Sequence, residues 1–316
     1  MRRLGKWWIW LVVCGLFPYT LFSQDLQPQR LSEQSPLSVV PEYAVRHPFY
    51  ITLVEVGNSM PLSFRDTLEN TLLRPEKLYP FFDRLVNNES PVRILHLGDS
   101  HVRGHVFTVT TRHRLEQAWG SYAVVPDSIT YRTSALAVET GAPGLVYHTL
   151  GINGATTVNF RTPEKLAALD SLRPDLVILS FGTNESHGSR YSEKMHRMEL
   201  DSMLHAVNTY CPKAEVLLTT PPGSYLRRRR RQRVINPTTP RVADAILAFA
   251  NQKELPVWDL YHIAGGSRRA CANWVNNKYM QRDRVHYTHD GYRLQGALLA
   301  EAILKAYNGY VENRFD

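Results

Sequence analysis

Cysteine is scarce in this chain, and no compositional bias of the kind that marks disordered or fibrous proteins is present. The 316 residues include three cysteines, and 43% of residues are hydrophobic and 21% charged. This is the composition of an ordinary globular protein, long enough to bury a large core. No internal repeat and no second domain can be recognised. The composition therefore excludes a fibre, a repeat array and a mainly disordered chain.

Long apolar runs are also missing, with one short exception at the start. Three positive charges in residues 1–6 precede an apolar stretch over residues 7–17, and Ser23 offers a small residue for cleavage. Residues 1–23 are therefore predicted to be a secretory signal peptide, and the protein is predicted to be exported. The run is too short for a comfortable membrane span, so no stable span is expected after cleavage. An uncleaved N-terminal anchor is the alternative.

The two cysteines left after such cleavage are Cys211 and Cys271. Export permits them to form a disulfide, and two buried free thiols are the alternative. The residues that follow the signal, up to about position 45, are polar and show little periodicity. Residues 24–77 are accordingly predicted to be an N-terminal extension, flexible in part.

The formal net charge is +8, with an isoelectric point near 9.4. Much of the excess comes from one run that Arg233 extends, consisting of Arg227, Arg228, Arg229, Arg230 and Arg231. No nucleic-acid-binding motif accompanies the run, so no nucleic-acid partner is expected. The run is either a solvated loop or a site of association with an anionic polymer of the cell wall or envelope.

Short apolar runs alternate with helical patterns from position 78 onward. The expected strands are 92–97, 145–150, 176–181, 216–220 and 257–260. The expected helices are 78–86, 106–119, 163–172, 193–210, 239–252 and 291–307. Strands that alternate with helices in this way predict a parallel sheet covered on both faces. Ligands of such sheets lie beyond the carboxyl ends of the strands, so the residues there are the candidates for function.

The first candidate is Ser100, which follows the first strand in the sequence Gly98-Asp99-Ser100-His101. A serine hydroxyl becomes a useful nucleophile only beside a base, and a serine in this place can equally be a helix N-cap. Gly154 follows the second strand, where its backbone N–H can point into a site or simply belong to a turn.

Asn184 follows the third strand and offers a side-chain N–H donor, although it can also be a turn or cap residue. Asp283 and His286 precede the last helix at a spacing of three, which places both side chains on one face of a turn. An acid beside a histidine fixes the tautomer of the ring, and a surface salt bridge is the alternative reading of the pair.

Taken together and in this order, the four blocks resemble the SGNH/GDSL hydrolase family. The family's Ser, Gly, Asn and His fall on Ser100, Gly154, Asn184 and His286, and its acid falls on Asp283. The resemblance covers residues 78–316 as the predicted hydrolase domain. It implies a three-layer α/β/α sandwich with a parallel, flavodoxin-like sheet of about five strands.

His101 stands where the family name implies leucine, and this departure bears on the substrate. The blocks Gly-Asp-Ser-His, Gly-x-Asn-Gly-Ala and Gly-Thr-Asn-Glu resemble the bacterial peptidoglycan O-acetylesterases. Many of those enzymes carry a β-rich insertion between the first two blocks, but here about fifty residues separate them, too few for a β-sandwich. Trp274, Tyr287 and Tyr292 could stack on a sugar or belong to the core.

These residues predict a secreted serine esterase that removes O-acetyl groups from a polysaccharide such as peptidoglycan, without a metal or organic cofactor. Ser100, Asp283 and His286 form the triad, and Ser100, Gly154 and Asn184 form the oxyanion hole. One alternative is a metal-dependent hydrolase, with ligands drawn from Asp99, His101, His105, Asp283, His286 and His289. A non-catalytic glycan-binding protein on the same fold is the other.

Overall fold

The computed structural model describes residues 49–53, 56, 60–65, 68–120, 123–124, 134–228 and 232–315. The predicted signal peptide and residues 229–231 of the arginine run lie outside these ranges. Within the described ranges, no helix combines the length and the apolar character that crossing a membrane requires.

Seven strands of the described chain form the main sheet. They are β1 (Leu72–Leu73), β2 (Pro91–Gly98), β4 (Ser134–Ala135), β6 (Gly144–Gly151), β7 (Leu176–Ser180), β8 (Glu215–Thr219) and β11 (Val257–Trp258). Their order across the sheet is β1-β11-β8-β7-β2-β6-β4. The five middle strands are parallel, and the short β1 and β4 pair antiparallel at the two edges. Numbered along the chain, the parallel strands follow the order 2-1-3-4-5, which is the flavodoxin-like arrangement.

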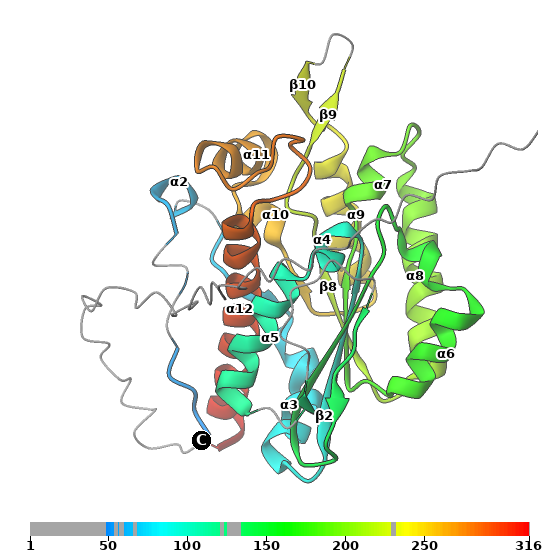
Figure 1. Cartoon of the computed structure of the whole chain (residues 1–316), viewed down its shortest axis with the longest axis vertical. Coiled ribbons are helices and arrows are strands. Elements are labelled where there is room, and N and C mark those ends of the chain that lie inside the picture. The colour runs from blue at the N-terminus through cyan, green and yellow to red at the C-terminus, as the bar shows by residue number, and fades with distance from the viewer. Residues whose placement is uncertain are drawn as a thin grey trace, which may run out of the picture. The chain divides into compact units, whose positions relative to one another are not determined.

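Helices cover both faces of this sheet (Figure 1). The longer ones are α3 (Tyr79–Asn87), α5 (Val106–Trp119), α6 (Pro163–Leu172), α8 (Glu193–Tyr210), α9 (Thr239–Gln252), α11 (Gly266–Asn276) and α12 (His289–Phe315). The short ones are α2 (Leu62–Arg65), α4 (Ser100–Arg103), α7 (Thr183–His187), α10 (Leu260–Ile263), and the 3₁₀ turns η2 (Pro75–Leu78) and η3 (Thr157–Phe160). The predicted three-layer sandwich is confirmed.

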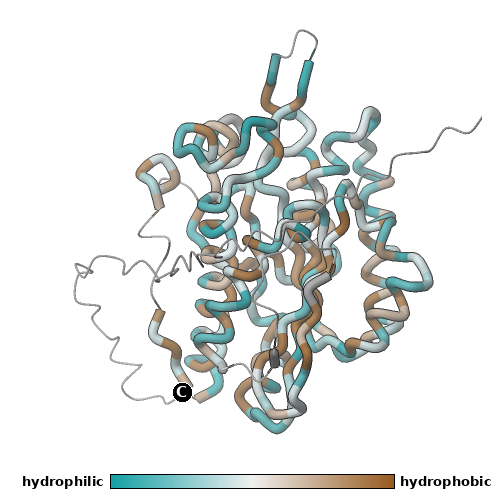
Figure 2. The backbone as a smooth tube through the Cα atoms, viewed as in Figure 1, coloured by the Kyte–Doolittle hydropathy of each residue, from teal (hydrophilic) through white to brown (hydrophobic). Residues whose placement is uncertain are grey.

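The central strands are apolar on both sides because each side meets a layer of helices. In β7, Leu176 and Ile178 join a core with α3, α5 and α12, whereas Val177 and Leu179 join one with α6, α8 and α9. Successive side chains of a strand point to opposite faces, so a strand between two layers reads as a continuous apolar run. Figure 2 shows these apolar segments along the central strands.

Four predicted helices, α5, α6, α8 and α9, begin and end at the expected residues. The last helix is longer than its apolar pattern suggested. Its final polar turn is held against α3, since Arg314 forms an ion pair with Asp83 at 2.9 Å and Asn313 donates to the Tyr79 hydroxyl at 2.9 Å. Contacts with a neighbouring helix therefore extend α12 where the sequence pattern ends.

The segment before the predicted domain start packs onto the sheet. β1 pairs with β11, and the Trp258 indole Nε1–H donates to Asn70 Oδ1 at 2.9 Å. The Asn70 amide in turn donates to the Leu298 carbonyl at 2.9 Å. Between residues 120 and 145, the structure has β3 (Ala123–Val124), which pairs with β5 (Val138–Glu139), and the edge strand β4.

Of the two alternatives for the cysteines, the structure has the free thiols. Cys211 and Cys271 are both buried and unpaired, each with its Sγ directed at a backbone carbonyl. Burial raises the pKa of the Cys211 thiol to about 11 and that of Cys271 to about 12. Both therefore stay protonated and behave as small apolar core residues.

Candidate active site

The turn after β2 presents Ser100 at the carboxyl end of the sheet. Asp99, not Ser100, caps the following helix, since its Oδ1 accepts the His101 N–H at 2.9 Å. A Cβ on Gly98 would lie 2.3 Å from the Val102 side chain and 2.7 Å from the Ser180 carbonyl. Only glycine lets the helix start this close to the strand. Ser100 is the first residue of α4, where a backbone N–H has no acceptor within the helix.

The His286 ring lies within hydrogen-bond distance of this serine on one side and of Asp283 on the other. His286 Nε2 is 3.0 Å from Ser100 Oγ, and His286 Nδ1 is 2.6 Å from Asp283 Oδ2. The other Asp283 oxygen accepts the backbone N–H groups of Val285 at 2.9 Å and His286 at 3.0 Å. The carboxylate therefore holds both the loop and the ring, and Ser100 and His286 meet although 186 positions separate them.

The environment of Asp283 favours its ionised form. Partial burial raises the pKa of this carboxyl, but hydrogen bonds from the His286 ring and from the Val285 and His286 N–H groups outweigh burial, so the net pKa lies below the ordinary value. The Asp283 side chain is 44% exposed and that of His286 is 34% exposed. A substrate can therefore approach from the Asp–His side, while Ser100 itself is only 9% exposed.

The two other expected site residues lie on turns that are joined to the serine turn. Asn184 Nδ2 donates to the Ala155 carbonyl at 2.9 Å and to Asp99 Oδ2 at 3.3 Å. Gly154, next to Ala155, has φ +69°, and a Cβ there would meet nothing within 4 Å. The left-handed backbone, not lack of space, is what favours glycine at this position. The carboxyl ends of β2, β6 and β7 thus converge around Ser100.

His101 is packed behind the reacting groups. Its Nδ1 is 2.9 Å from the Tyr292 hydroxyl, and its ring lies 5.5 Å from that of His286 between centroids. Burial lowers the pKa of His101 to about 3, so the ring is neutral at ordinary pH. The side chain that replaces the family's leucine is therefore a buried hydrogen-bonding partner of α12.

Of the two readings of the aromatic residues near the Asp–His pair, the structure has the core reading and not the sugar-stacking one. Trp274 and Tyr287 are fully buried and Tyr292 is 5% exposed. Edge-to-face contacts join Trp274 to Tyr287 at 5.1 Å and Tyr287 to Tyr292 at 5.7 Å between centroids. Their polar atoms bond to protein groups, as with the Tyr287 hydroxyl and the Gly223 carbonyl at 2.8 Å. These rings support the His286 loop from behind.

Two buried carboxyl groups lie under the site. From the sequence, Asp99 was considered only as a possible metal ligand, and Glu185 was not singled out. Burial raises the pKa of Asp99 to about 7 and that of Glu185 to about 8, and the charge of Asp99 further opposes ionisation of Glu185. Glu185 Oε2 accepts the Gly182 N–H at 2.9 Å and so fixes the turn that carries Asn184. The sequence feature that could have pointed to both residues is an acid at the start of a helix, here α4 and α7, because such positions are capping sites.

A second Asp-x-x-His pair has almost the same internal geometry as the first. His262 Nδ1 lies 2.7 Å from Asp259 Oδ2. Asp259 caps α10, and its Oδ1 accepts the Thr220 hydroxyl at 2.9 Å. This pair has the spacing of Asp283 and His286, but His286 is the one that faces Ser100.

The ligand set considered for a metal does not assemble. Among the residues that the structure describes, no group of three or more His, Cys, Asp and Glu side chains is arranged to hold a metal ion. His101 instead bonds to Tyr292, and His105 stands at the N-cap of α5 with φ 63°.

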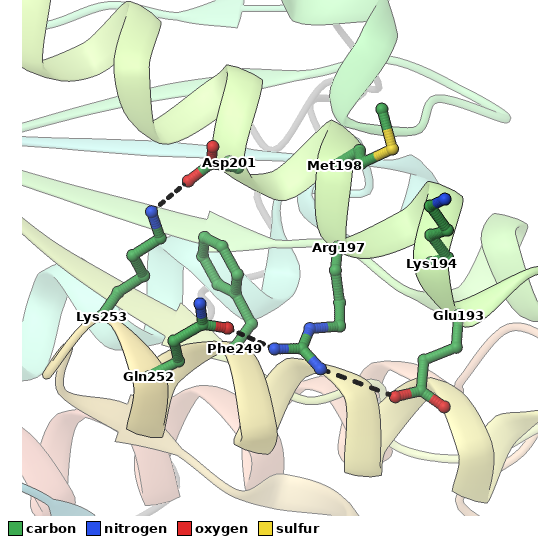
Figure 3. A pocket seen from close by; sticks show the side chains of 8 residues that line it. All are labelled: Glu193, Lys194, Arg197, Met198, Asp201, Phe249, Gln252 and Lys253. Carbon is green, nitrogen blue, oxygen red and sulfur yellow. Dashed lines mark hydrogen bonds and ion pairs between the residues drawn. The ribbon is translucent and has the colours of Figure 1, made fainter.

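Neither of two cavities in the described part of the structure is a better candidate for the active site. A groove of about 570 Å³ lies between α8 and α9, and its lining includes none of Ser100, Asp283 and His286 (Figure 3). Four of its five charged side chains are paired, since Lys253 lies 2.5 Å from Asp201 and Arg197 forms an ion pair with Glu193 as well as a hydrogen bond with Gln252. Asp99 and His101 border a small cavity of about 20 Å³, whose lining includes neither Ser100 nor His286.

Comparison with known proteins is consistent with this geometry. The family model of the GDSL-like lipase/acylhydrolases matches residues 97–294. A solved structure titled "Peptidoglycan O-acetylesterase in action" is 18% identical, covers 73% of this chain and 96% of its own, and has a TM-score of 0.62. A GDSL-like lipase from Bacteroides thetaiotaomicron is 20% identical over 72% of this chain and 99% of its own, with a TM-score of 0.44. No curated protein matches this chain.

The family match spans more than half of the chain, and the structural likeness supports the fold. The resemblance seen in the sequence blocks is therefore confirmed, and with it the class of reaction. The chain belongs to the GDSL-like lipase/acylhydrolase family and is a carboxylic ester hydrolase.

Proposed function

We propose that the chain is an exported serine esterase that removes O-acetyl groups from peptidoglycan. The observation that carries the catalytic part is the line of hydrogen bonds from Ser100 Oγ through the His286 ring to Asp283, with separations of 3.0 and 2.6 Å. A serine, a base that can accept its proton and an acid that orients the base are the parts of nucleophilic ester hydrolysis.

In the proposed reaction, Ser100 Oγ attacks the ester carbonyl while His286 Nε2 takes the hydroxyl proton. The same nitrogen then protonates the leaving sugar oxygen, which leaves an acetyl group on Ser100. Water, deprotonated by His286, attacks this acetyl ester. Acetate leaves and Ser100 recovers its proton from His286.

The oxyanion would be held by the backbone N–H groups of Ser100 and Gly154 and by the Asn184 amide. The Asn184 amide donates one N–H to the Ala155 carbonyl at 2.9 Å and the other to Asp99 Oδ2 at the longer distance of 3.3 Å. The N–H that forms the longer bond would leave Asp99 and donate to the oxyanion. A donor already aimed at the developing charge contributes about 3 kcal/mol to the transition state.

Support for an acetyl group on a glycan comes from the comparison and from the sequence. The solved structure with a TM-score of 0.62 bears the name of a peptidoglycan O-acetylesterase. The blocks around Ser100, Gly154 and Asn184 resemble those of the same enzymes. Export through the predicted signal peptide would place the enzyme with that polymer.

The test is acetate release from O-acetylated peptidoglycan, acetylated xylan and an aryl acetate. Ser100→Ala and His286→Ala should each lower kcat by about 10⁴-fold or more on every substrate that the parent enzyme hydrolyses. His262→Ala is the matched control and should retain the parent rate. Full hydrolysis by Ser100→Ala would overturn the triad, and release from xylan but not peptidoglycan would overturn the substrate. N-terminal sequencing of the exported protein should begin at Gln24.

A further inference from the structure

The two ends of the arginine-rich segment are short strands that pair with one another as a β-hairpin beside the candidate active site. β9 (Tyr225–Arg227) pairs antiparallel with β10 (Arg233–Ile235), and the hairpin projects past α7 and α11 (Figure 1). Arg227, Arg228 and Arg233 are all exposed. The sequence has no acidic residue between Glu215 and Asp244, so the segment supplies no negative charge of its own.

The charge on this hairpin opposes its own pairing. Arg227 stands directly opposite Arg233 in the register, and like charges at paired positions destabilise a two-stranded ladder. Such a short ladder has little stability to spare. Within the described residues, no carboxylate forms an ion pair with Arg227, Arg228 or Arg233. A positive cluster that costs stability and has no carboxylate paired with it is suited to binding an external anion.

The base of the hairpin is bonded to the loop that carries the triad acid. The Tyr225 N–H donates to the Arg284 carbonyl at 2.9 Å, and the Arg284 guanidinium lies over the Tyr225 ring at 5.8 Å. The Arg233 guanidinium donates to the Asp283 carbonyl. These contacts fix the direction of the hairpin relative to Asp283 and His286.

A second set of contacts holds the chain that enters the hairpin. Ser224 is buried, and its hydroxyl is 2.9 Å from His187 Nε2. The Ser224 carbonyl accepts the Asn236 N–H at 2.9 Å, which closes the base of the hairpin. The hairpin is thus an extension of the site's framework. At a strand rise of about 3.3 Å per residue, Arg227 and Arg228 stand about 7–10 Å beyond Tyr225.

We propose that Arg227 and Arg228 bind carboxylates of the same glycan polymer whose ester enters the site, so that the hairpin holds the polymer across Ser100. The proposal rests on the proposed function, since it concerns how that substrate is recognised. Guanidinium groups suit this role because their paired N–H groups match the geometry of a carboxylate. Peptidoglycan, whose peptide stems carry carboxylates, is such a polymer. Arg227 and Arg228 are exposed, so salt screens their ion pairs with the polymer and the contribution should be strong only at low salt.

The experiment separates binding from hydrolysis by using the Ser100→Ala background. Co-sedimentation with purified peptidoglycan is measured for this protein, for R227Q/R228Q added to it, and for the matched control R173Q/K213Q. The control residues are exposed and precede β7 and β8, so they lie at the amino-terminal ends of these strands, whereas Ser100 lies at the carboxyl-terminal end of β2. The double hairpin variant should bind about tenfold more weakly in 50 mM NaCl, and the control should bind as the parent does.

Amidation of the polymer's carboxylates should weaken the parent to the level of R227Q/R228Q, and so should 500 mM NaCl. Equal binding by R227Q/R228Q and the parent, or binding unaffected by amidation, overturns the proposal. Tighter binding to duplex DNA than to peptidoglycan under the same conditions overturns it as well. In the enzymes with Ser100 intact, R227Q/R228Q should raise KM for O-acetylated peptidoglycan about tenfold relative to the control. If the parent binds through these arginines but releases no acetate from any glycan, the proposed function fails and the binding surface stands.

Discussion

Replacement of Asp283 by asparagine tests the role of the acid while it leaves the loop intact. Asp283 Oδ1 accepts two backbone N–H groups, from Val285 at 2.9 Å and from His286 at 3.0 Å. The amide oxygen of asparagine can keep both bonds. The atom 2.6 Å from His286 Nδ1 becomes an NH₂ group, which can only donate. His286 must then carry its own proton on Nε2, where it can no longer accept one from Ser100.

The size of the loss in kcat depends on how firmly residue 283 holds the His286 ring in one tautomer. In a serine triad with a buried acid, the same exchange lowers kcat by about 10⁴-fold. Here the Asp283 and His286 side chains are 44% and 34% exposed, so water can compete for Nδ1 and the ring can turn over. We expect a loss of kcat of about 10³-fold, which corresponds to about 4 kcal/mol in the barrier. KM for a small ester should change little, because the carboxylate is placed to touch the histidine and not the ester.

The assay is the initial rate of aryl acetate hydrolysis, with the melting temperature recorded for each variant. Asp259→Asn is the matched control, since it makes the same exchange in the pair in which Asp259 Oδ2 lies 2.7 Å from His262 Nδ1. The control should stay within about twofold of the parent in kcat, because Asp259 lies outside the line of hydrogen bonds from Ser100 through His286 to Asp283. A loss below tenfold in Asp283→Asn, or an equal loss in Asp259→Asn, would refute the reasoning.

Two further predictions concern stability. Glu185 has a folded-state pKa of about 8, against 4.5 for the free side chain. Between these values the folded protein holds a proton that the unfolded chain releases. The contribution of Glu185 to the stability of the folded state therefore falls as pH rises from about 5 to 8. Glu185→Gln, which still accepts the Gly182 N–H, should therefore gain melting temperature relative to the parent across that range; a difference that does not change with pH would contradict this. Asn70→Ala should lower the free energy of unfolding in urea by about 1–3 kcal/mol, because the Trp258 N–H is left buried without an acceptor, whereas the Leu298 carbonyl keeps its bond within α12. A loss below about 0.5 kcal/mol would show that the Trp258 N–H finds another acceptor.

The sequence by itself determined the layers and most of their boundaries. The alternation of apolar runs with helical patterns is a local property, and burial on both faces leaves a continuous apolar signature in strands such as β7. Four residue blocks at the ends of strands were enough to select the family, because the carboxyl ends of parallel strands meet at one edge. Ser100, Gly154 and Asn184 were proposed as site residues in this way.

The tertiary structure decided what local spacing leaves open. Asp259 with His262 and Asp283 with His286 have the same spacing and nearly the same internal distance, and only the path of the chain brings one of them to Ser100. Burial likewise turned three aromatic rings from sugar-stacking candidates into core, and it left Cys211 and Cys271 as free thiols.

The arginine run shows the same division. Its charge is read from the sequence, but its attachment to the Asp283 loop depends on contacts between segments some fifty residues apart, such as Arg233 with Asp283. Which of several equivalent local patterns becomes a site is set by long-range packing, because the distance between two side chains in space is not encoded in their separation along the chain.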